Sequence, residues 1–450
     1  MKTYLLHKAT IVTAEKEAVG SVVVSDGKIA DVFYIESEDF DYRIFKTRST
    51  YPDIETVELE GRYLIAGGID GHVHFRDPGL THKADMNTES RAAAAGGVTT
   101  VLDMPNTVPA TTSAEALIEK TGLAKERSCI NIGFNIGATN GNADEIVDMI
   151  EGRTAADPNV IKGVKIFMGS STGNMLVDEG SALDRLFSIK SRPVLVHCED
   201  EQTIRENLQA AVERYGDEIP FTEHDSIRSR RACIKSSIKA LEKAIAHETR
   251  LVLCHISTKE EIEMVRAAKC NNPSVTAETS CNYLWFSNED YDRLGSRLKC
   301  NPAVKSPSDR AALREALANG GIDVIGSDHA PHLLSEKEGP YTKVPSGLPS
   351  IQQSLPVLVT IADEEDIPLT RIAAVFSENA SDIYELNTGK IRKGYNADIV
   401  VFDRNKEFTV RNEDQFSKCG WSPYEGITLK GEIEMVMVNG QIIYRDRNFI

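Results

Sequence analysis

The stretch Asp70-Gly71-His72-Val73-His74-Phe75-Arg76-Asp77-Pro78-Gly79 decides the fold that the whole chain predicts. It follows the apolar run 63–69 and ends at a Pro-Gly pair, a pattern typical of a strand that runs into a turn. Side chains alternate between the faces of a strand, so His72 and His74 point to the same side. Two imidazoles at one strand end form half of a metal site. Arg76 follows on that side, where it can meet an anionic group of a ligand.

The middle of the chain, residues 63–385, alternates short apolar runs with helical patterns. This alternation is typical of βα units and a parallel sheet. The runs predicted as strands are 64–75, 99–104, 130–136, 160–168, 193–197, 250–255, 274–277 and 322–327. Eight such units over about 300 residues predict an α/β fold of the (β/α)8 TIM-barrel class. The main alternative is a doubly wound sheet, but no glycine-rich dinucleotide-binding motif follows the first strand.

Both ends of the chain are rich in β-strand patterns and show no long helical period. Residues 1–62 contain several short β-rich segments separated by glycine turns. Residues 386–450 contain further segments, two of which flank Asn439-Gly440, a pair typical of a hairpin turn. We therefore expect a small β-sandwich domain built from both chain ends, 1–62 and 386–450, beside a barrel at 63–385.

The composition argues against several classes of partner. The 450 residues carry a formal net charge of −17, which disfavours nucleic acid and anionic membranes because both require a basic surface. The first residues lack the apolar core of a signal peptide and no run reaches transmembrane length, so we expect a cytoplasmic enzyme. The eight cysteines include no CxxC pair and are predicted to be reduced thiols. Cys198 and Cys254 each adjoin a histidine, and strand alternation predicts that they face away from it into packing.

In a barrel of this kind the active site lies at the C-terminal ends of the strands. The predicted strands end with polar residues, namely His72 and His74, Asp103, Asn135, Lys165, His197, His255, Glu278 and Asp328. Each residue taken alone has a structural alternative, as a hydrogen-bonded core residue, a surface lysine or a helix cap. Four histidines, a lysine and an aspartate at strand ends together favour a metal site.

Several motifs show which family the chain resembles. Asp70-Gly71-His72-Val73-His74, combined with His197, His255 and Asp328, resembles the amidohydrolase superfamily. Three further segments resemble its dihydroorotase branch, namely His74-Phe75-Arg76-Asp77-Pro78-Gly79, Met104-Pro105-Asn106-Thr107 and Ser327-Asp328-His329-Ala330-Pro331-His332. The likeness covers nearly the whole chain, including both parts of the small β domain.

The resemblance implies a site for two Zn²⁺ ions in each chain. The ligands that it implies are His72, His74 and Asp328 for one ion, His197 and His255 for the other, and an N6-carboxylated Lys165 that bridges both. An ammonium group beside two zinc ions is electrostatically unfavourable, whereas a neutral amine can take up CO₂. A carboxylated lysine therefore suits the bridging position.

The resemblance also implies a reaction, the reversible hydrolysis of L-dihydroorotate to N-carbamoyl-L-aspartate in pyrimidine biosynthesis. Asp328 would be the general acid and base. The substrate-binding residues that the resemblance implies are His74, Arg76, Asn106, Asn301, His332, Ser346 and Gly347. Among them Arg76, Asn106 and His332 would hold the substrate carboxylate, for which a guanidinium group is well suited.

Two alternatives remain open at this point. Allantoinases and dihydropyrimidinases or hydantoinases share the metal ligands, but their substrates lack the ring carboxylate. A non-catalytic scaffold protein is a remoter alternative, since all six ligand positions are filled. The resemblance further implies a homodimer. Two loops, 169–174 and 333–345, are candidates for a lid.

Overall fold

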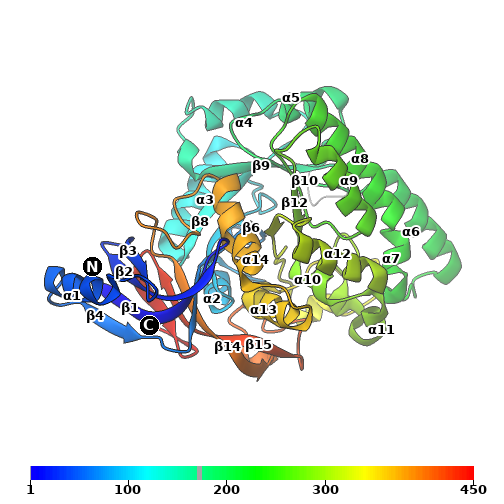
Figure 1. Ribbon diagram of the computed structural model, residues 1–450. Coiled ribbons are helices and arrows are strands. Elements are labelled where there is room, and N and C mark those ends of the chain that lie inside the picture. Colours follow the sequence, from blue (N-terminus) through cyan, green and yellow to red (C-terminus); the bar gives the residue numbers. More distant parts are fainter. Residues whose placement is uncertain (1, 170–174) are drawn as a thin grey trace.

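The centre of the computed structural model, which describes residues 2–169 and 175–450, is a barrel of eight parallel strands (Figure 1). Neighbouring strands follow each other in chain order, which confirms the predicted α/β barrel. The strands are β6 (Gly68–Val73), β7 (Val98–Asp103), β8 (Asn131–Gly137), β9 (Ile161–Phe167), β10 (Val194–His197), β11 (Leu251–Leu253), β12 (Thr276–Thr279) and β13 (Val324–Ile325).

The barrel closes between its first strand and the segment that follows its last. Val73 pairs with His329 in a parallel bridge, and the backbone N–H of His74 donates to the carbonyl of His329 at 2.8 Å. The Asp70 carboxylate accepts hydrogen bonds from the backbone N–H of His72, at 3.0 Å, and of Ser327, at 3.1 Å. The histidine motif therefore joins the two ends of the barrel sheet.

Helices cover the outside of the barrel, and several begin at a residue suited to capping. The side chains of Asp85, Ser113, Thr258 and Ser306 each accept a hydrogen bond from a backbone N–H in the first turn. The main covering helices are α2 (Met86–Ala95), α3 (Ala114–Arg127), α4 (Ala143–Ile150), α5 (Gly180–Phe187), α8 (Arg230–Ala246), α9 (Lys259–Lys269), α12 (Pro307–Asn319) and α13 (Ser354–Glu364). Below the site, Ile69, Leu102, Leu195 and Val252 fill the barrel with apolar side chains.

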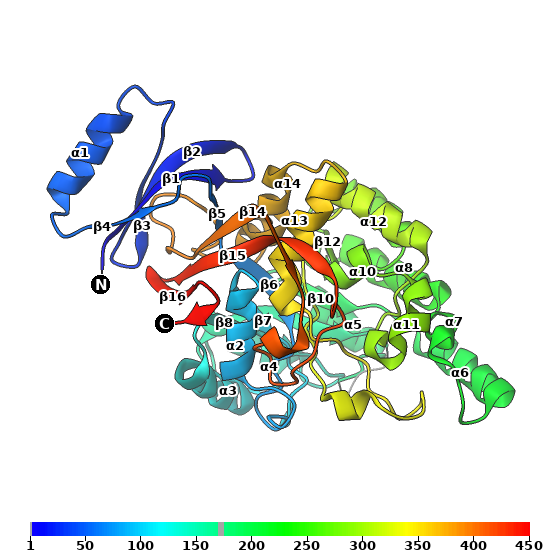
Figure 2. The ribbon, with the colours of Figure 1, turned by 90° about the horizontal axis from the view of Figure 1, so that it is seen from below.

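The two chain ends form a second sheet beside the barrel, and both termini lie on this side of the molecule (Figures 1 and 2). Its strands are β1 (Tyr4–Val12), β2 (Glu17–Ser25), β3 (Lys28–Tyr34), β4 (Glu55–Glu58), β5 (Tyr63–Ala66), β14 (Ile399–Thr409), β15 (Thr428–Val438), β16 (Gln441–Arg445) and β17 (Asn448–Phe449). Antiparallel pairing of β5 with β14 joins the N-terminal and C-terminal parts. Hydrogen bonds connect all nine strands in one mixed sheet.

Two local features differ from the sequence-based expectations. The predicted strand 64–75 is divided at Gly67, so β5 belongs to the terminal sheet and β6 to the barrel. A Cβ atom at Gly67 would lie 2.1 Å from Oγ1 of Thr99, so this close approach requires glycine. The N-terminal part also contains a helix, α1 (Phe40–Thr50), that the sequence pattern does not reveal, because it buries only Phe40 and Thr47.

Two further expectations concern membranes and the candidate lids. No helix among residues 2–169 and 175–450 has the length and apolar character needed to cross a bilayer. Of the two candidate lids, the segment 170–174 lies outside the described residues. The other, 333–345, begins with a short 3₁₀ turn at Leu334–Lys337.

A fully buried ion pair ties helix α3 to the strand ends that carry the site. Lys120 Nζ lies 2.7 Å from Asp103 Oδ2, and both side chains have no exposed surface. Lys120 also donates to the carbonyl of Met104 at 2.8 Å. The other oxygen of Asp103 accepts from the backbone N–H of Phe75 at 2.8 Å. The pair therefore fixes the backbone between His74 and Arg76.

Replacing Lys120 by methionine is expected to destabilise the fold by about 3–5 kcal/mol, because it leaves the buried Asp103 carboxylate without its partner. Urea denaturation followed by circular dichroism measures this loss. Lys125→Met, at an exposed position of the same helix, is the control and is expected to change stability by less than about 0.5 kcal/mol. Equal stabilities of the two variants would contradict the role of the pair.

Candidate active site

A cavity of about 340 Å³ opens at the C-terminal ends of the barrel strands. All of the site residues predicted from the sequence line it: His72, His74, Arg76, Asn106, Lys165, His197, His255, Asn301, Asp328, His332, Ser346 and Gly347. Its size lies in the range of about 300–1,000 Å³ that is usual for small-molecule sites. The fold thus brings the predicted residues together, while their individual roles remain predictions.

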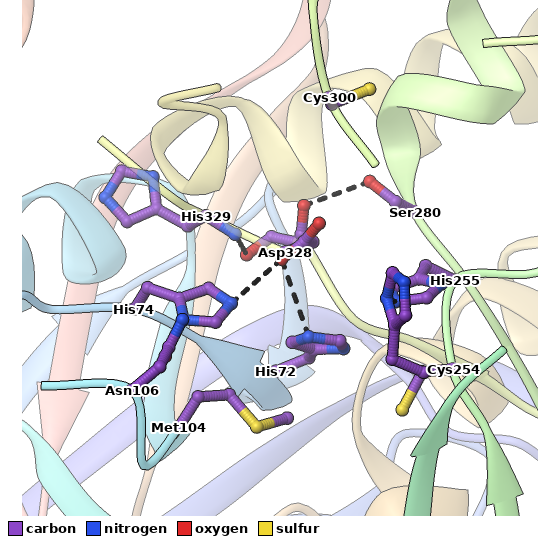
Figure 3. Close-up of polar contacts among 12 residues, drawn as sticks. His72, His74, Met104, Asn106, Cys254, His255, Ser280, Cys300, Asp328 and His329 are labelled. Carbon is purple, nitrogen blue, oxygen red and sulfur yellow. Dashed lines mark hydrogen bonds and ion pairs between the residues drawn. The ribbon is translucent and has the colours of Figure 1, made fainter. Parts of the chain in front are cut away.

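The first group of candidate metal ligands comprises His72, His74 and Asp328, which converge from β6 and from the segment after β13 (Figure 3). Oδ1 of Asp328 lies 3.0 Å from Nε2 of His74 and 3.5 Å from Nε2 of His72. Asp328 has a left-handed backbone conformation, with φ of +49°. This uncommon conformation for a non-glycine residue turns its carboxylate towards the histidines.

The second group faces the first from the other side of the barrel. Nδ1 of His197 lies 2.9 Å from Nε2 of His255, and the rings of His72 and His255 are 5.2 Å apart. Lys165, on β9, is fully buried and lines the same cavity. Its Nζ lies 3.3 Å from the sulfur of Cys254.

The protonation states of these groups suit a metal ion. Burial lowers the pKa of His72 and of His255 well below the usual histidine value, so both rings are neutral at pH 7. Burial alone would raise the pKa of Asp328, but the adjacent His72 and His74 lower it overall. Metal ions bind neutral imidazoles and ionised carboxylates, so no proton has to be displaced.

The donor set also fits zinc, which prefers imidazole nitrogen and carboxylate oxygen. The ligand atoms of His72, His74 and Asp328 all lie within 4.8 Å of one another. Nδ1 of His255 is buried and has no hydrogen-bond partner among the residues that the structure describes. The residues present therefore fit a metal ion, and Lys165 lines the same cavity.

Two buried glutamates that the sequence analysis did not assign to the site hold the histidines in place. Oε1 of Glu278 lies 2.7 Å from Nδ1 of His72 and accepts from the backbone N–H of His255. Oε2 of Glu199 lies 3.0 Å from Nε2 of His197, and Arg228 binds the same carboxylate through Nη2 at 2.5 Å. Such partners orient metal-binding histidines. Glu278 ends the seventh predicted strand, and this position was the sequence feature that could have assigned it to the site.

One prediction about the cysteines is wrong. Cys198 packs between the barrel and its helices, as expected. Cys254 instead points into the barrel, where it belongs to the inner apolar cluster with Ile69 and Leu195 and lies 3.3 Å from the Lys165 amine. The reason is the left-handed backbone of His255, whose φ of +40° interrupts strand alternation and lets both neighbours face inward.

The cavity wall also carries a buried cation. Arg76 is 7% exposed, and its Nε donates to the carbonyl of Pro331 at 3.1 Å. Its Nη2 lies 3.1 Å from Nε2 of His332. Within the described parts of the chain, no carboxylate lies within 4 Å of this guanidinium. Asn106 lies beside it in the cavity wall and contacts Nδ1 of His74 at 2.6 Å.

The last part of the wall is a backbone segment that requires glycine. Gly347 has a φ of +140°, and a Cβ atom there would lie 2.5 Å from the carbonyl of Ala330. Its N–H donates to the carbonyl of Lys299 at 2.9 Å, and its carbonyl accepts from the buried Lys337 at 3.1 Å. These bonds hold the backbone of 345–347 against the cavity.

Comparisons with known proteins agree with this geometry. The Amidohydrolase family model matches residues 63–443, which is most of the chain. The chain therefore belongs to the amidohydrolase family. A dihydroorotase of Methanosarcina acetivorans is 32% identical over 441 residues, which cover 94% of this chain and 88% of that protein. An allantoinase of Desulfitobacterium hafniense is 29% identical over 99% of this chain and 96% of its own length.

The solved structures give the same fold for this amidohydrolase. The L-hydantoinase (dihydropyrimidinase) of Arthrobacter aurescens superposes with a TM-score of 0.90 at 24% identity, over all of this chain and 98% of that one. The relatives indicate a hydrolase that acts on cyclic amides. Amidohydrolases are generally metal-dependent, in agreement with the cluster of His72, His74 and Asp328.

In this amidohydrolase, Glu278→Gln is expected to weaken zinc binding by about 10- to 100-fold, because the amide orients the His72 ring less firmly than the carboxylate does. Competition with a chromogenic chelator measures the affinity. Glu263→Gln, on the exposed face of α9, is the matched control and is expected to bind zinc as the wild type does. Unchanged affinity in Glu278→Gln would show that this contact does not support the site.

Proposed function

We propose that this amidohydrolase is a dihydroorotase, which reversibly hydrolyses the ring amide of L-dihydroorotate to N-carbamoyl-L-aspartate in pyrimidine biosynthesis. The observation that carries the proposal is the Arg76 guanidinium, which is buried in the cavity wall without a carboxylate partner among the described residues. A buried charge without a partner is costly, so a fold that keeps one at a cavity favours an anionic ligand there.

The position of Arg76 supports a substrate with a carboxylate on the ring. Its guanidinium lines the same cavity as His197 and His255, so one molecule can contact the cation and the metal ligands together. Burial lowers the pKa of Arg76, but arginine keeps its charge at neutral pH. Allantoin and dihydrouracil carry no carboxylate and would leave this charge without a partner. L-dihydroorotate supplies one.

The metal centre that we propose contains two Zn²⁺ ions. His72, His74 and Asp328 would hold one ion, His197 and His255 the other, and a carboxylated Lys165 would bridge them. When bound, zinc polarises the amide carbonyl and lowers the pKa of water to about 7. The full burial of Lys165 among apolar strand residues would shield its carboxylated form from solvent.

Asp328 is the residue that we assign to proton transfer. Its carboxylate is ionised, as its low pKa requires, and it lies 3.0 Å from Nε2 of His74 in the centre of the site. From there it can take a proton from the attacking water and deliver it to the ring nitrogen that leaves.

We assign recognition of the substrate ring to Asn301, Ser346 and Gly347. Oδ1 of Asn301 is buried without a hydrogen-bond partner in the described part of the chain, so it is available to accept a ring N–H. The backbone of Ser346 and Gly347 lines the same cavity and supplies further peptide groups. Asn106 and His332, together with Arg76, surround the expected position of the carboxylate.

An allantoinase or hydantoinase activity is the second candidate. The observation that favours it is the closeness of such proteins over the full length of the chain, with 29% identity to the allantoinase and a TM-score of 0.90 to the hydantoinase. Substrates of that kind use the same amide chemistry. A turnover assay with the zinc-loaded protein on dihydroorotate, allantoin and dihydrouracil separates the candidates. Turnover of dihydroorotate alone is the expected result.

Arg76→Met is expected to raise the KM for dihydroorotate by about 100-fold, because it removes charge-assisted hydrogen bonds to the carboxylate. The KM for dihydrouracil, if it is turned over at all, is expected to stay within about threefold. Steady-state kinetics on both substrates measure the difference. Arg91→Met, at an exposed position of α2, is the control. Equal effects on the two substrates would argue against a carboxylate at Arg76.

Asp328→Asn is expected to lower kcat by about 10²- to 10⁴-fold, the contribution usual for a general acid and base. The amide can still offer an oxygen, so the variant is expected to retain zinc. Kinetics and zinc content measured on the same preparation distinguish lost proton transfer from lost metal. Near-normal turnover would refute the assignment.

A further inference from the structure

His332 contacts two cationic hydrogen-bond donors, but its neutral ring can accept only one hydrogen bond. Nζ of Lys83 lies 3.0 Å from Nδ1, and Nη2 of Arg76 lies 3.1 Å from Nε2. An ammonium and a guanidinium can only donate, whereas a neutral imidazole has one lone pair. Burial and the charges of Arg76 and Lys83 lower the pKa of His332, so the ring is neutral. One of the two cations therefore faces an N–H.

The remaining contacts decide which nitrogen carries the proton. Nε2 lies 3.1 Å from the carbonyl oxygen of Ser346, which accepts and cannot donate. This contact requires a proton on Nε2 and leaves the lone pair on Nδ1, where Lys83 can donate. Lys83 is itself held by Glu336, whose Oε1 lies 2.9 Å from its Nζ. The chain of contacts thus runs from Glu336 through Lys83 to His332.

We propose that Lys83 is a positioning residue that sets the tautomer of His332. Its donation to Nδ1 keeps the proton on Nε2, which faces the Ser346 carbonyl and lies 3.1 Å from Nη2 of Arg76 at the cavity. A carboxylate at the cavity would accept from Nη2 of Arg76 with one oxygen and share the Nε2–H of His332 with the Ser346 carbonyl through the other. This inference rests on the proposed function only for the identity of that carboxylate.

Lys83 acts from behind the site. His332 and Arg76 line the cavity, whereas Lys83 is absent from its lining. Its side chain is 14% exposed and lies in the turn before α2. The backbone of His332 is fixed separately, because its carbonyl accepts from Nε1 of Trp421 at 2.8 Å. A change at Lys83 is therefore expected to alter the proton position and to leave the ring in place.

Loss of the ammonium would favour the opposite tautomer. With Lys83 replaced by methionine, a proton on Nδ1 would face Oε2 of Glu336, which lies 3.8 Å away. Nε2 would then accept from Arg76 and could no longer donate to a substrate. The cavity would lose the Nε2–H donor of His332. One N–H of the Arg76 guanidinium would also be bonded to His332 and would be less available to a substrate.

The test combines kinetics with NMR on the zinc-loaded enzyme. Lys83→Met is expected to raise the KM for dihydroorotate by about 10- to 100-fold, the loss of one hydrogen bond to a charged group. The effect on kcat is expected to be much smaller. Lys83→Arg, which keeps a donor, is expected to restore most of the affinity. Lys343→Met, exposed on the 333–347 segment, is the matched control and is expected to behave as the wild type does.

Histidine-selective ¹⁵N labelling provides the second measurement, with the His332 signal assigned from its absence in His332→Asn. We expect the Nε2–H tautomer in the wild type and the Nδ1–H tautomer in Lys83→Met. A KM for dihydroorotate within about twofold of the wild type in Lys83→Met, or an unchanged tautomer, overturns the inference. If the wild type does not turn over dihydroorotate, the proposed function fails, and the tautomer measurement still tests Lys83.

Discussion

The contact between the first barrel strand and the segment after the last is the constraint on which the site depends. Asp70 accepts from the backbone of Ser327, and His74 bonds to the carbonyl of His329. These bonds join segments about 250 residues apart in the chain. The motif that closes the barrel also carries His72 and His74. The same contacts therefore close the barrel and place the first group of candidate metal ligands. Asp328 is placed by the same contact.

The cavity has two electrostatic halves that serve different purposes. On one side, burial keeps the imidazoles of His72 and His255 neutral, and the carboxylate of Asp328 is ionised. That half is prepared for cations. On the other side, Arg76 keeps a charge with no carboxylate partner among the described residues, which prepares that half for an anion. The proposed substrate, which has both an amide and a carboxylate, would contact both halves at once.

Buried groups behind the cavity support each half. Glu278 and Glu199 hold His72 and His197 by their second nitrogens, so their rings are oriented before any ion binds. On the side that carries Arg76, Lys83 donates to Nδ1 of His332. None of these three supporting residues lines the cavity. Residues outside the cavity thus contact the histidines that line it.

Sequence patterns predicted the barrel, because the alternation of apolar runs and helical periods is a local property of the chain. Strand ends and family motifs also predicted most residues that line the cavity, but not Phe167, Ala330 or Pro345. They missed α1, whose apolar stripe is too weak, and the division of β5 from β6 at Gly67, which depends on the distant Thr99.

The sequence by itself therefore determined the fold class, the family resemblance and the set of residues at the site. Only the tertiary structure decided which other side chains form hydrogen bonds to these site residues. Strand alternation put Cys254 on the wrong face, since the left-handed backbone of His255 interrupts the alternation. The partners Glu278 and Lys83 come from other strands and loops, and their contacts exist only when the chain has folded.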